Sequence, residues 1–184
     1  MECISNFKKK KTGDGTDGRL EVWLRFKVAR QFLTPLTRLI NMGFATKKRG
    51  KTPLGRAMSY TLKGCMEGTY PNIRVNPELV QLSNGSAVIP LSATAERQGD
   101  LIQISWRPDS DGVGCFHDDG IIVCAYHVES SVAGINEMAA VRSDGRTELV
   151  LPVQLADKPV HVYAMAHCRD KKNFSKTIYL GEHW

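Results

Sequence analysis

The chain has 184 residues, enough for one sizeable domain or two small ones, and a fold of this size buries roughly 70% of its unfolded surface. Its 42% hydrophobic and 24% charged residues match globular averages, which excludes a wholly disordered or fibrous chain. The net charge of +6 is unevenly divided: residues 1–75 carry 16 Lys or Arg against 5 Asp or Glu, and residues 76–184 carry 9 against 14. This asymmetry suggests two regions with different partners, or a basic arm that contacts an acidic domain.

Residues 1–19 combine a lysine run with a stretch rich in Gly, Thr and Asp, and we predict a flexible basic tail there. Over residues 20–40, apolar side chains recur every three or four positions, which predicts an amphipathic helix with Trp23 and Phe26 on its core face. Pro35 lacks a backbone N–H and restricts the residue before it, so it predicts a kink or two consecutive helices.

A further helix is expected after Thr52 and Pro53, which resemble an N-cap followed by a first-turn proline. It should end near residue 66. Residues 20–75 therefore form a basic helical segment of one kinked helix or two to three helices.

From residue 76 onward the apolar period becomes two, which is typical of β-strands. No helical period separates most of the strand candidates, and this favours an antiparallel sandwich over residues 76–184. The predicted fold is therefore α+β, a helical N-terminal segment followed by an immunoglobulin- or fibronectin-III-like β-sandwich. Trp106 would be its core tryptophan, with Ile104, Val162 and Ala164 also facing inward. The strand candidates are residues 79–82, 87–91, 101–106, 121–128, 147–153, 160–168 and 176–180.

Beyond these patterns, the chain resembles an uncharacterised family of short Bacteroidetes proteins, a domain of unknown function with a helical N-terminal part and a C-terminal sandwich. The resemblance covers about residues 25–181 and implies no reaction, cofactor or catalytic residue. The motifs that carry it are Phe32-Leu33-Thr34-Pro35-Leu36, Asn41-Met42-Gly43-Phe44, Ser59-Tyr60-Thr61-Leu62-Lys63, Gly68-Thr69-Tyr70-Pro71-Asn72, Leu82-Ser83-Asn84-Gly85, Ile104-Ser105-Trp106 and Val160-His161-Val162-Tyr163.

A Cys/His group is the sharpest chemical signal: Cys115, His117, Cys124 and His127. Zinc takes four such ligands in a tetrahedron, usually from tight pairs. Residues three apart on a strand point to opposite faces, so Cys124 and His127 are poorly placed to share a metal. We therefore favour buried thiols with histidines at the rim, and no cofactor. The sequence also contains no G-x-S-x-G elbow, no H-E-x-x-H helix and no glycine-rich phosphate loop, so we expect no enzymatic activity.

The basic half could neutralise phosphates along a nucleic acid, with Trp23, Phe26, Tyr60 or Tyr70 stacking on bases. Against this interpretation, these aromatics lie at helical core spacing and lysine runs are usually solvated. The candidate phosphate contacts are Lys8, Lys9, Lys10, Lys11, Arg25, Lys27, Arg30, Lys47, Lys48, Arg49 and Lys51.

The first hypothesis for function is therefore a non-catalytic binding or assembly module, with an unknown protein partner or a second copy bound through sandwich edges and end loops. A nucleic-acid-associated protein is the second hypothesis, and a metal-dependent enzyme the third. Five cysteines without a C-x-x-C pair favour a reducing compartment. No stretch approaches the ~18 apolar residues of a membrane span, and the first 18 residues lack the apolar segment of a signal peptide. We expect a soluble cytoplasmic protein with no membrane partner.

Overall fold

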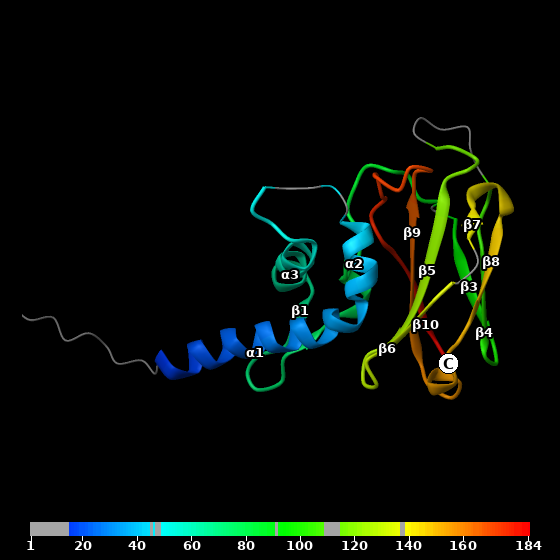
Figure 1. Ribbon diagram of the computed structural model, residues 1–184. Coiled ribbons are helices and arrows are strands. Elements are labelled where there is room, and N and C mark those ends of the chain that lie inside the picture. Colours follow the sequence, from blue (N-terminus) through cyan, green and yellow to red (C-terminus); the bar gives the residue numbers. More distant parts are fainter. Residues whose placement is uncertain (1–14, 45, 47–48, 91, 109–114, 137–138) are drawn as a thin grey trace, which may run out of the picture.

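The computed structural model describes residues 15–44, 46, 49–90, 92–108, 115–136 and 139–184 of the chain. Helices gather at one side of the molecule and antiparallel strands at the other (Figure 1). This arrangement confirms the predicted α+β class, with the helices first along the chain.

The first helical unit is bent, as the sequence predicts. Its parts are α1 (Gly15–Leu33), the 3-10 turn η1 (Thr34–Leu36) and α2 (Thr37–Gly43). Pro35 lies in η1, where it cannot donate a backbone hydrogen bond, and the chain changes direction there (Figure 1). The start of α1 at Gly15 corrects the tail boundary at residue 19.

The next helix, α3 (Pro53–Gly64), begins where the sequence predicts. The Thr52 hydroxyl accepts the backbone N–H of Gly55 at 3.0 Å, and Pro53 occupies a first-turn position that needs no N–H donor. A two-stranded hairpin of β1 (Met66–Glu67) and β2 (Arg74–Val75) follows. None of the helices within the described residues combines the length and the apolar character needed to cross a bilayer.

Two antiparallel sheets form the rest of the described chain. One has the strand order β10-β9-β5-β6, with β7 paired to the start of β5, and the other has the order β3-β4-β8. The strands are β3 (Thr94–Gln98), β4 (Leu101–Ser105), β5 (Gly120–His127), β6 (Val132–Ile135), β7 (Ala140–Val141), β8 (Arg146–Val150), β9 (Val160–His167) and β10 (Ile178–His183). The 3-10 turns among them are η2 (Pro77–Leu79), η3 (Arg142–Asp144) and η4 (Val153–Leu155).

The two sheets face each other across one hydrophobic core, and together we call them the two-sheet unit. Ile104 on β4 packs there with Val162 and Ala164 on β9, and all three are buried. Trp106 follows β4 and is 6% exposed, and its indole N–H donates to the Arg142 carbonyl at 2.8 Å. The four residues named as core from the sequence therefore lie in one cluster.

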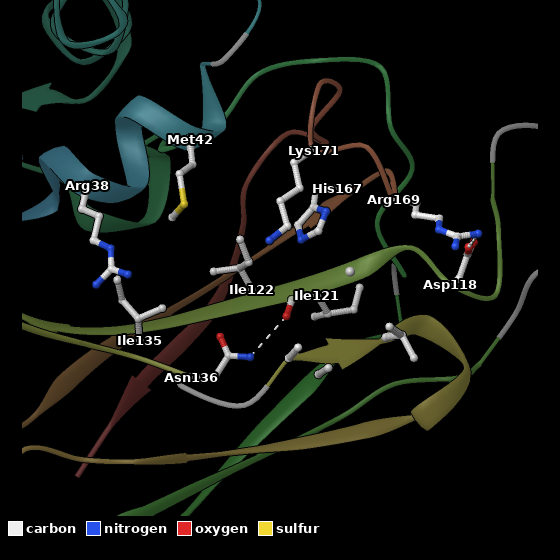
Figure 2. Close-up of a pocket in the computed structure, with 14 residues that line it drawn as sticks. Arg38, Met42, Asp118, Ile121, Ile122, Ile135, Asn136, His167, Arg169 and Lys171 are labelled. Atoms are coloured by element: carbon white, nitrogen blue, oxygen red, sulfur yellow. Dashed lines mark hydrogen bonds and ion pairs between the residues drawn. The ribbon is translucent and has the colours of Figure 1, made fainter.

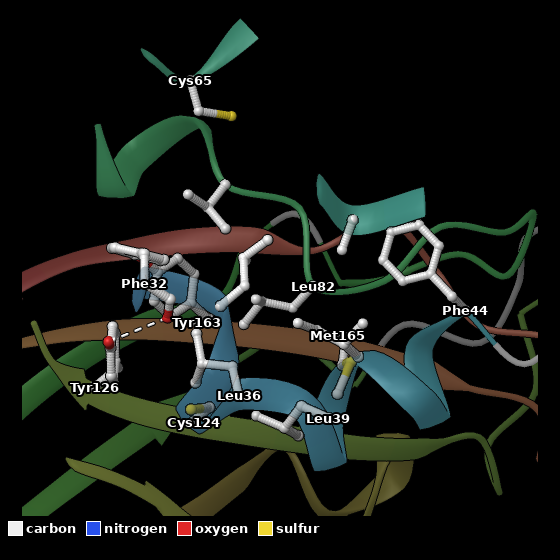
Figure 3. Close-up of a cluster of buried hydrophobic side chains, with 14 of the residues drawn as sticks. Phe32, Leu36, Leu39, Phe44, Cys65, Leu82, Cys124, Tyr126, Tyr163 and Met165 are labelled. Carbon is white, nitrogen blue, oxygen red and sulfur yellow. Dashed lines mark hydrogen bonds between the residues drawn. The ribbon is translucent and has the colours of Figure 1, made fainter. Parts of the chain in front are cut away.

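A second core joins the helices to the other face of the five-stranded sheet (Figure 3). Leu36 and Leu39 pack over Cys124 and Tyr126 of β5. The Tyr126 hydroxyl donates to the Phe32 carbonyl at 3.1 Å, and their rings meet edge to face at 5.1 Å. Because of these contacts, β5 and β9 are buried on both faces. The predicted boundary between residues 75 and 76 is therefore crossed by a shared core.

Two predicted strands, residues 79–82 and 87–91, are not strands in the structure. Residue 79 ends the 3-10 turn η2, and the backbone N–H groups of Leu82 and Ser83 donate to the Thr177 hydroxyl at 3.0 and 2.9 Å. A side chain therefore replaces the strand ladder that the alternating pattern suggested. Ala87 makes only an isolated bridge to Ser175, and residue 91 lies outside the described residues.

The sequence analysis missed five strands, β1 and β2 of the hairpin and β3, β6 and β7 of the two-sheet unit. β3 is an edge strand whose sequence is largely polar, because one face is open to water and the other is only half-buried. It pairs along its full length with β4, from Thr94 opposite Ser105 to Gln98 opposite Leu101. Backbone pairing with β4 therefore holds β3 in the sheet, although its sequence has almost no hydrophobic alternation.

Candidate functional site

A groove lies between α1 and α3, in the part of the molecule where α1 extends beyond the sheets (Figure 1). It consists of two adjoining hollows of about 670 and 510 Å³, which share Thr52 and Gly55 at the start of α3. We call it the α1–α3 groove. Its lining residues are Trp23, Phe26, Lys27, Arg30, Gly50, Lys51, Thr52, Leu54, Gly55, Arg56, Met58, Ser59, Tyr60 and Lys63.

Large aromatic side chains are exposed in this groove. Trp23 is 59% and Phe26 52% exposed, so the prediction that they face the core is wrong. The reason is the length of α1: Ala29 and Phe32, near its C-terminal end, reach the rest of the fold and are buried, whereas the earlier turns project past the sheets (Figure 1). Trp23 and Phe26 therefore form an exposed aromatic surface and not part of the core.

Positive charge accompanies these rings. Lys27, Arg30, Lys51 and Lys63 line the groove, and no Asp or Glu is among its described lining residues. The Lys27 ammonium lies 5.0 Å from the centroid of the Trp23 ring, a cation–π distance. The groove thus combines ring faces with cations that no lining carboxylate neutralises.

The wall formed by α3 is held in place by buried contacts. The Arg56 guanidinium donates to the carbonyls of Phe44 at 3.2 Å and Thr46 at 2.6 Å, and lies 4.9 Å from the Phe44 ring. The Tyr60 hydroxyl accepts from the Asn84 amide at 2.8 Å, which fixes the tilt of its ring. The N-terminal end of the α3 dipole, at Thr52, adds partial positive charge to the same wall.

Only part of the predicted basic set reaches the groove. Lys27, Arg30 and Lys51 line it. The Arg25 guanidinium pairs with Glu21 at 2.9 Å and is not a lining residue. Arg49 is exposed but does not line the groove. Lys8, Lys9, Lys10, Lys11, Lys47 and Lys48 lie outside the described residues.

Lys63 is an exposed cation of the groove that the sequence analysis missed. It shares the groove with Arg56 and Tyr60, to which it is related by spacings of seven and three on α3. Residues at such spacings lie on one helix face, so a search for basic and aromatic residues on that face would have found it.

The family comparison matches residues 5–181, almost the whole chain, to the Family of unknown function (DUF6266). The chain belongs to this family. This agrees with the resemblance to an uncharacterised domain, and it brings no activity to the groove. In a search of curated proteins, none matches the DUF6266 chain.

The Cys/His group of this DUF6266 chain is not assembled into a metal site. Cys115 is half-buried and His117 exposed ahead of β5, whereas Cys124 lies in the core under the helices. Burial raises the pKa of the Cys124 thiol to about 12, although a metal-binding thiol must be deprotonated. His127 accepts the Ser130 backbone N–H at 3.1 Å and so closes the β5–β6 turn. The described part of the chain holds no group of three or more His, Cys, Asp or Glu able to bind a metal.

Another histidine, His161, gives the DUF6266 chain a predictable pH dependence. Burial is the main cause that lowers the pKa of His161, and its ring nitrogen lies 3.0 Å from the Tyr179 hydroxyl. Because the folded-state pKa is below the unfolded value, the unfolded chain binds more protons, and stability should fall as the pH drops from about 7.5 to about 5.5. Urea unfolding at several pH values should show this decline, and a shallower one for His161→Gln. Identical pH profiles for the two proteins would contradict this assignment.

Proposed function

We propose that this protein is a non-catalytic binding module whose α1–α3 groove holds single-stranded nucleic acid. The observation that carries the proposal is the exposure of Trp23, Phe26 and Tyr60 next to cations, with no carboxylate among the described lining residues. Its non-catalytic character is supported by the sequence, which contains none of the nucleophile, zinc or phosphate-loop motifs considered above.

The chemistry of the groove suits a single strand better than a duplex. Bases of an unpaired strand expose their flat faces, which stack on aromatic side chains regardless of sequence. Lys27 lies against the Trp23 ring, where its ammonium can pair with the phosphate of a stacked nucleotide. Lys51 and Lys63 lie in the adjoining hollow, so a strand that continues past Trp23 meets further cations near Tyr60.

Fluorescence anisotropy of a labelled oligothymidylate, titrated with the full chain over a salt series, tests this proposal. Four phosphate contacts predict that log K falls with log salt at a slope of about −3, since each contact on a single strand contributes about −0.7. A duplex of equal length should bind more weakly, because its bases are not free to stack. A flat titration at low salt would overturn the proposal.

Matched variants separate the rings from the charges. Trp23→Ala should weaken binding by about fivefold or more, since base stacking contributes about 1–3 kcal/mol. Trp184→Ala removes a still more exposed ring, 83% exposed, outside the groove and should not weaken binding. Lys27→Gln with Lys51→Gln should make the slope shallower by about 1.4. Arg146→Gln with Lys176→Gln, two exposed cations elsewhere, should leave it unchanged.

A protein-binding or assembly role is the second candidate, with a protein partner or another copy as ligand. It is favoured by Val150 and Val153, which are 72% and 89% exposed at the end of β8. β8 is an edge strand of the three-stranded sheet, and unpaired strand edges can pair with another chain. A flat nucleic-acid titration together with concentration-dependent mass would favour this role over the first.

We further propose a fibronectin-III-like type for the two-sheet unit and a cytoplasmic location. The type is supported by the strand order, because β3-β4-β8 faces β10-β9-β5-β6 much as strands A, B and E face C, F and G in immunoglobulin-like sandwiches. The location is supported by the free thiols of Cys65 and Cys124, which are typical of a reducing compartment.

A further inference from the structure

A second cavity, of about 550 Å³, lies between α2, the start of β5 and the connection from β9 to β10. Figure 2 shows Arg38 and Met42 reaching it from α2, and His167 and Lys171 from the end of β9, with Ile122 between them. Its size is within the usual range of small-molecule sites, about 300–1,000 Å³. It shares no lining residue with the α1–α3 groove.

The charged groups around this cavity are mostly positive. Arg169 is 3.6 Å from Asp118, so this pair is close to neutral. Arg38 and Lys171 line the cavity too, and neither forms an ion pair with another described residue. Among the described residues, the cavity therefore carries two cations without an ion-pair partner above an apolar floor that includes Ile122.

The backbone at Lys171 has an unusual conformation. Its φ is 54°, in the left-handed region that residues with a side chain rarely adopt. The Lys171 N–H donates to the Cys168 carbonyl at 2.8 Å, which closes the turn after β9. Glycine or asparagine adopts this conformation at a lower energy than lysine. Lysine at this position therefore costs backbone conformational energy and places an ammonium at the cavity.

His167 is fixed beside Lys171 by close packing. A Cβ on Gly120 would lie 2.3 Å from the His167 ring, so only glycine at this position of β5 leaves room for the imidazole. The ring also packs 5.4 Å from Phe174, and its Nδ1 lies 2.9 Å from the Cys168 carbonyl. His167, whose position is restricted, thus lines the same cavity as Arg38 and Lys171.

We infer that this cavity binds a phosphate monoester that carries a small apolar group. A phosphate monoester has a charge of about −2 near neutral pH, which matches the two cations that have no ion-pair partner among the described residues. A guanidinium and an ammonium supply complementary geometry, a planar fork from Arg38 and a point charge from Lys171. The apolar substituent would lie against Met42 and Ile122. This site is independent of the groove and of its proposed ligand.

Phenyl phosphate, titrated into the ¹⁵N-labelled full chain and followed by NMR, tests this inference. We expect saturable shifts at the amides of Gly120, Ile122 and Lys171, and weaker binding of inorganic phosphate and of benzoate. Shifts that do not saturate, or that are confined to α1 and α3, would overturn the site. Equal affinity for inorganic phosphate would show that the site does not recognise the apolar group of the ligand. Equal affinity for benzoate would show that it does not require a double negative charge.

Variants extend the same titration. Arg38→Gln and Lys171→Gln should each weaken phenyl phosphate binding by about tenfold or more, as expected for loss of a charge-assisted contact. Lys171→Gly removes the same charge and suits a φ of 54°, so it should fold at least as stably and still bind weakly. Arg146→Gln with Lys176→Gln is the control for net charge. Unchanged affinity in the Lys171→Gly protein would refute the role of this ammonium.

Discussion

Replacing Trp106 with alanine should lower the free energy of unfolding by about 3 to 5 kcal/mol. The indole is 6% exposed and packs between the two sheets with Ile104 and Leu149. The substitution removes the largest side chain of this core and leaves a cavity that the two sheets cannot close without shifting. It also removes the N–H that the Arg142 carbonyl accepts at 2.8 Å. Urea denaturation followed by circular dichroism measures the loss.

Two comparisons separate the sources of this loss. Trp106→Phe keeps an aromatic ring but removes the N–H donor, so it should cost less than alanine and more than a surface change. Trp23→Ala deletes the same side chain where it is 59% exposed, and should shift stability by no more than about 0.5 kcal/mol. If Trp106→Ala unfolds at the same urea concentration as the Trp23 variant, the indole does not support the core.

Local sequence predicts those elements whose pattern has a local cause. The Thr52–Pro53 start of α3 and the bend at Pro35 follow from capping and from the missing N–H of proline. β5 and β9 could be located because their apolar runs are long. Their burial on both faces depends on α1 and α2, which end more than seventy residues before β5 begins, and period-two reasoning about one strand contains no such information.

The candidate site was harder to predict than the fold. Helical spacing shows that Phe26 shares a face with Ala29 and Leu33, which are buried, but it does not show where along α1 the rest of the protein ends. At Leu82 the sequence predicts a strand, but the Thr177 hydroxyl, ninety-five residues further along the chain, replaces the expected strand partner. Long-range contacts decide both cases, because they determine whether a ring is buried and whether a segment pairs as a strand.

A buried ion pair near the core that holds Trp106 leads to the second large expected effect. Arg142 and Asp119 are both almost fully buried, with their charged atoms 3.4 Å apart. Asp119 also accepts the backbone N–H of Phe116 at 3.0 Å, and Arg142 also donates to the Val88 carbonyl. These contacts tie the loop before β5 to η3 and to the segment before β3. Loss of one partner would leave the other charge inside the protein.

Asp119→Ala should therefore lower the free energy of unfolding by about 3 to 5 kcal/mol, the usual cost of breaking a buried pair from one side. Arg142→Met should cost less, because an isolated buried carboxyl can take up a proton whereas a guanidinium cannot release one. Together, Asp119→Ala and Arg142→Met should cost less than the sum of the single losses, since no charge then remains buried. Urea denaturation of all four proteins in a double-mutant cycle measures this coupling. Strictly additive losses would mean that the two charges stabilise the fold independently, against the geometry that places them together.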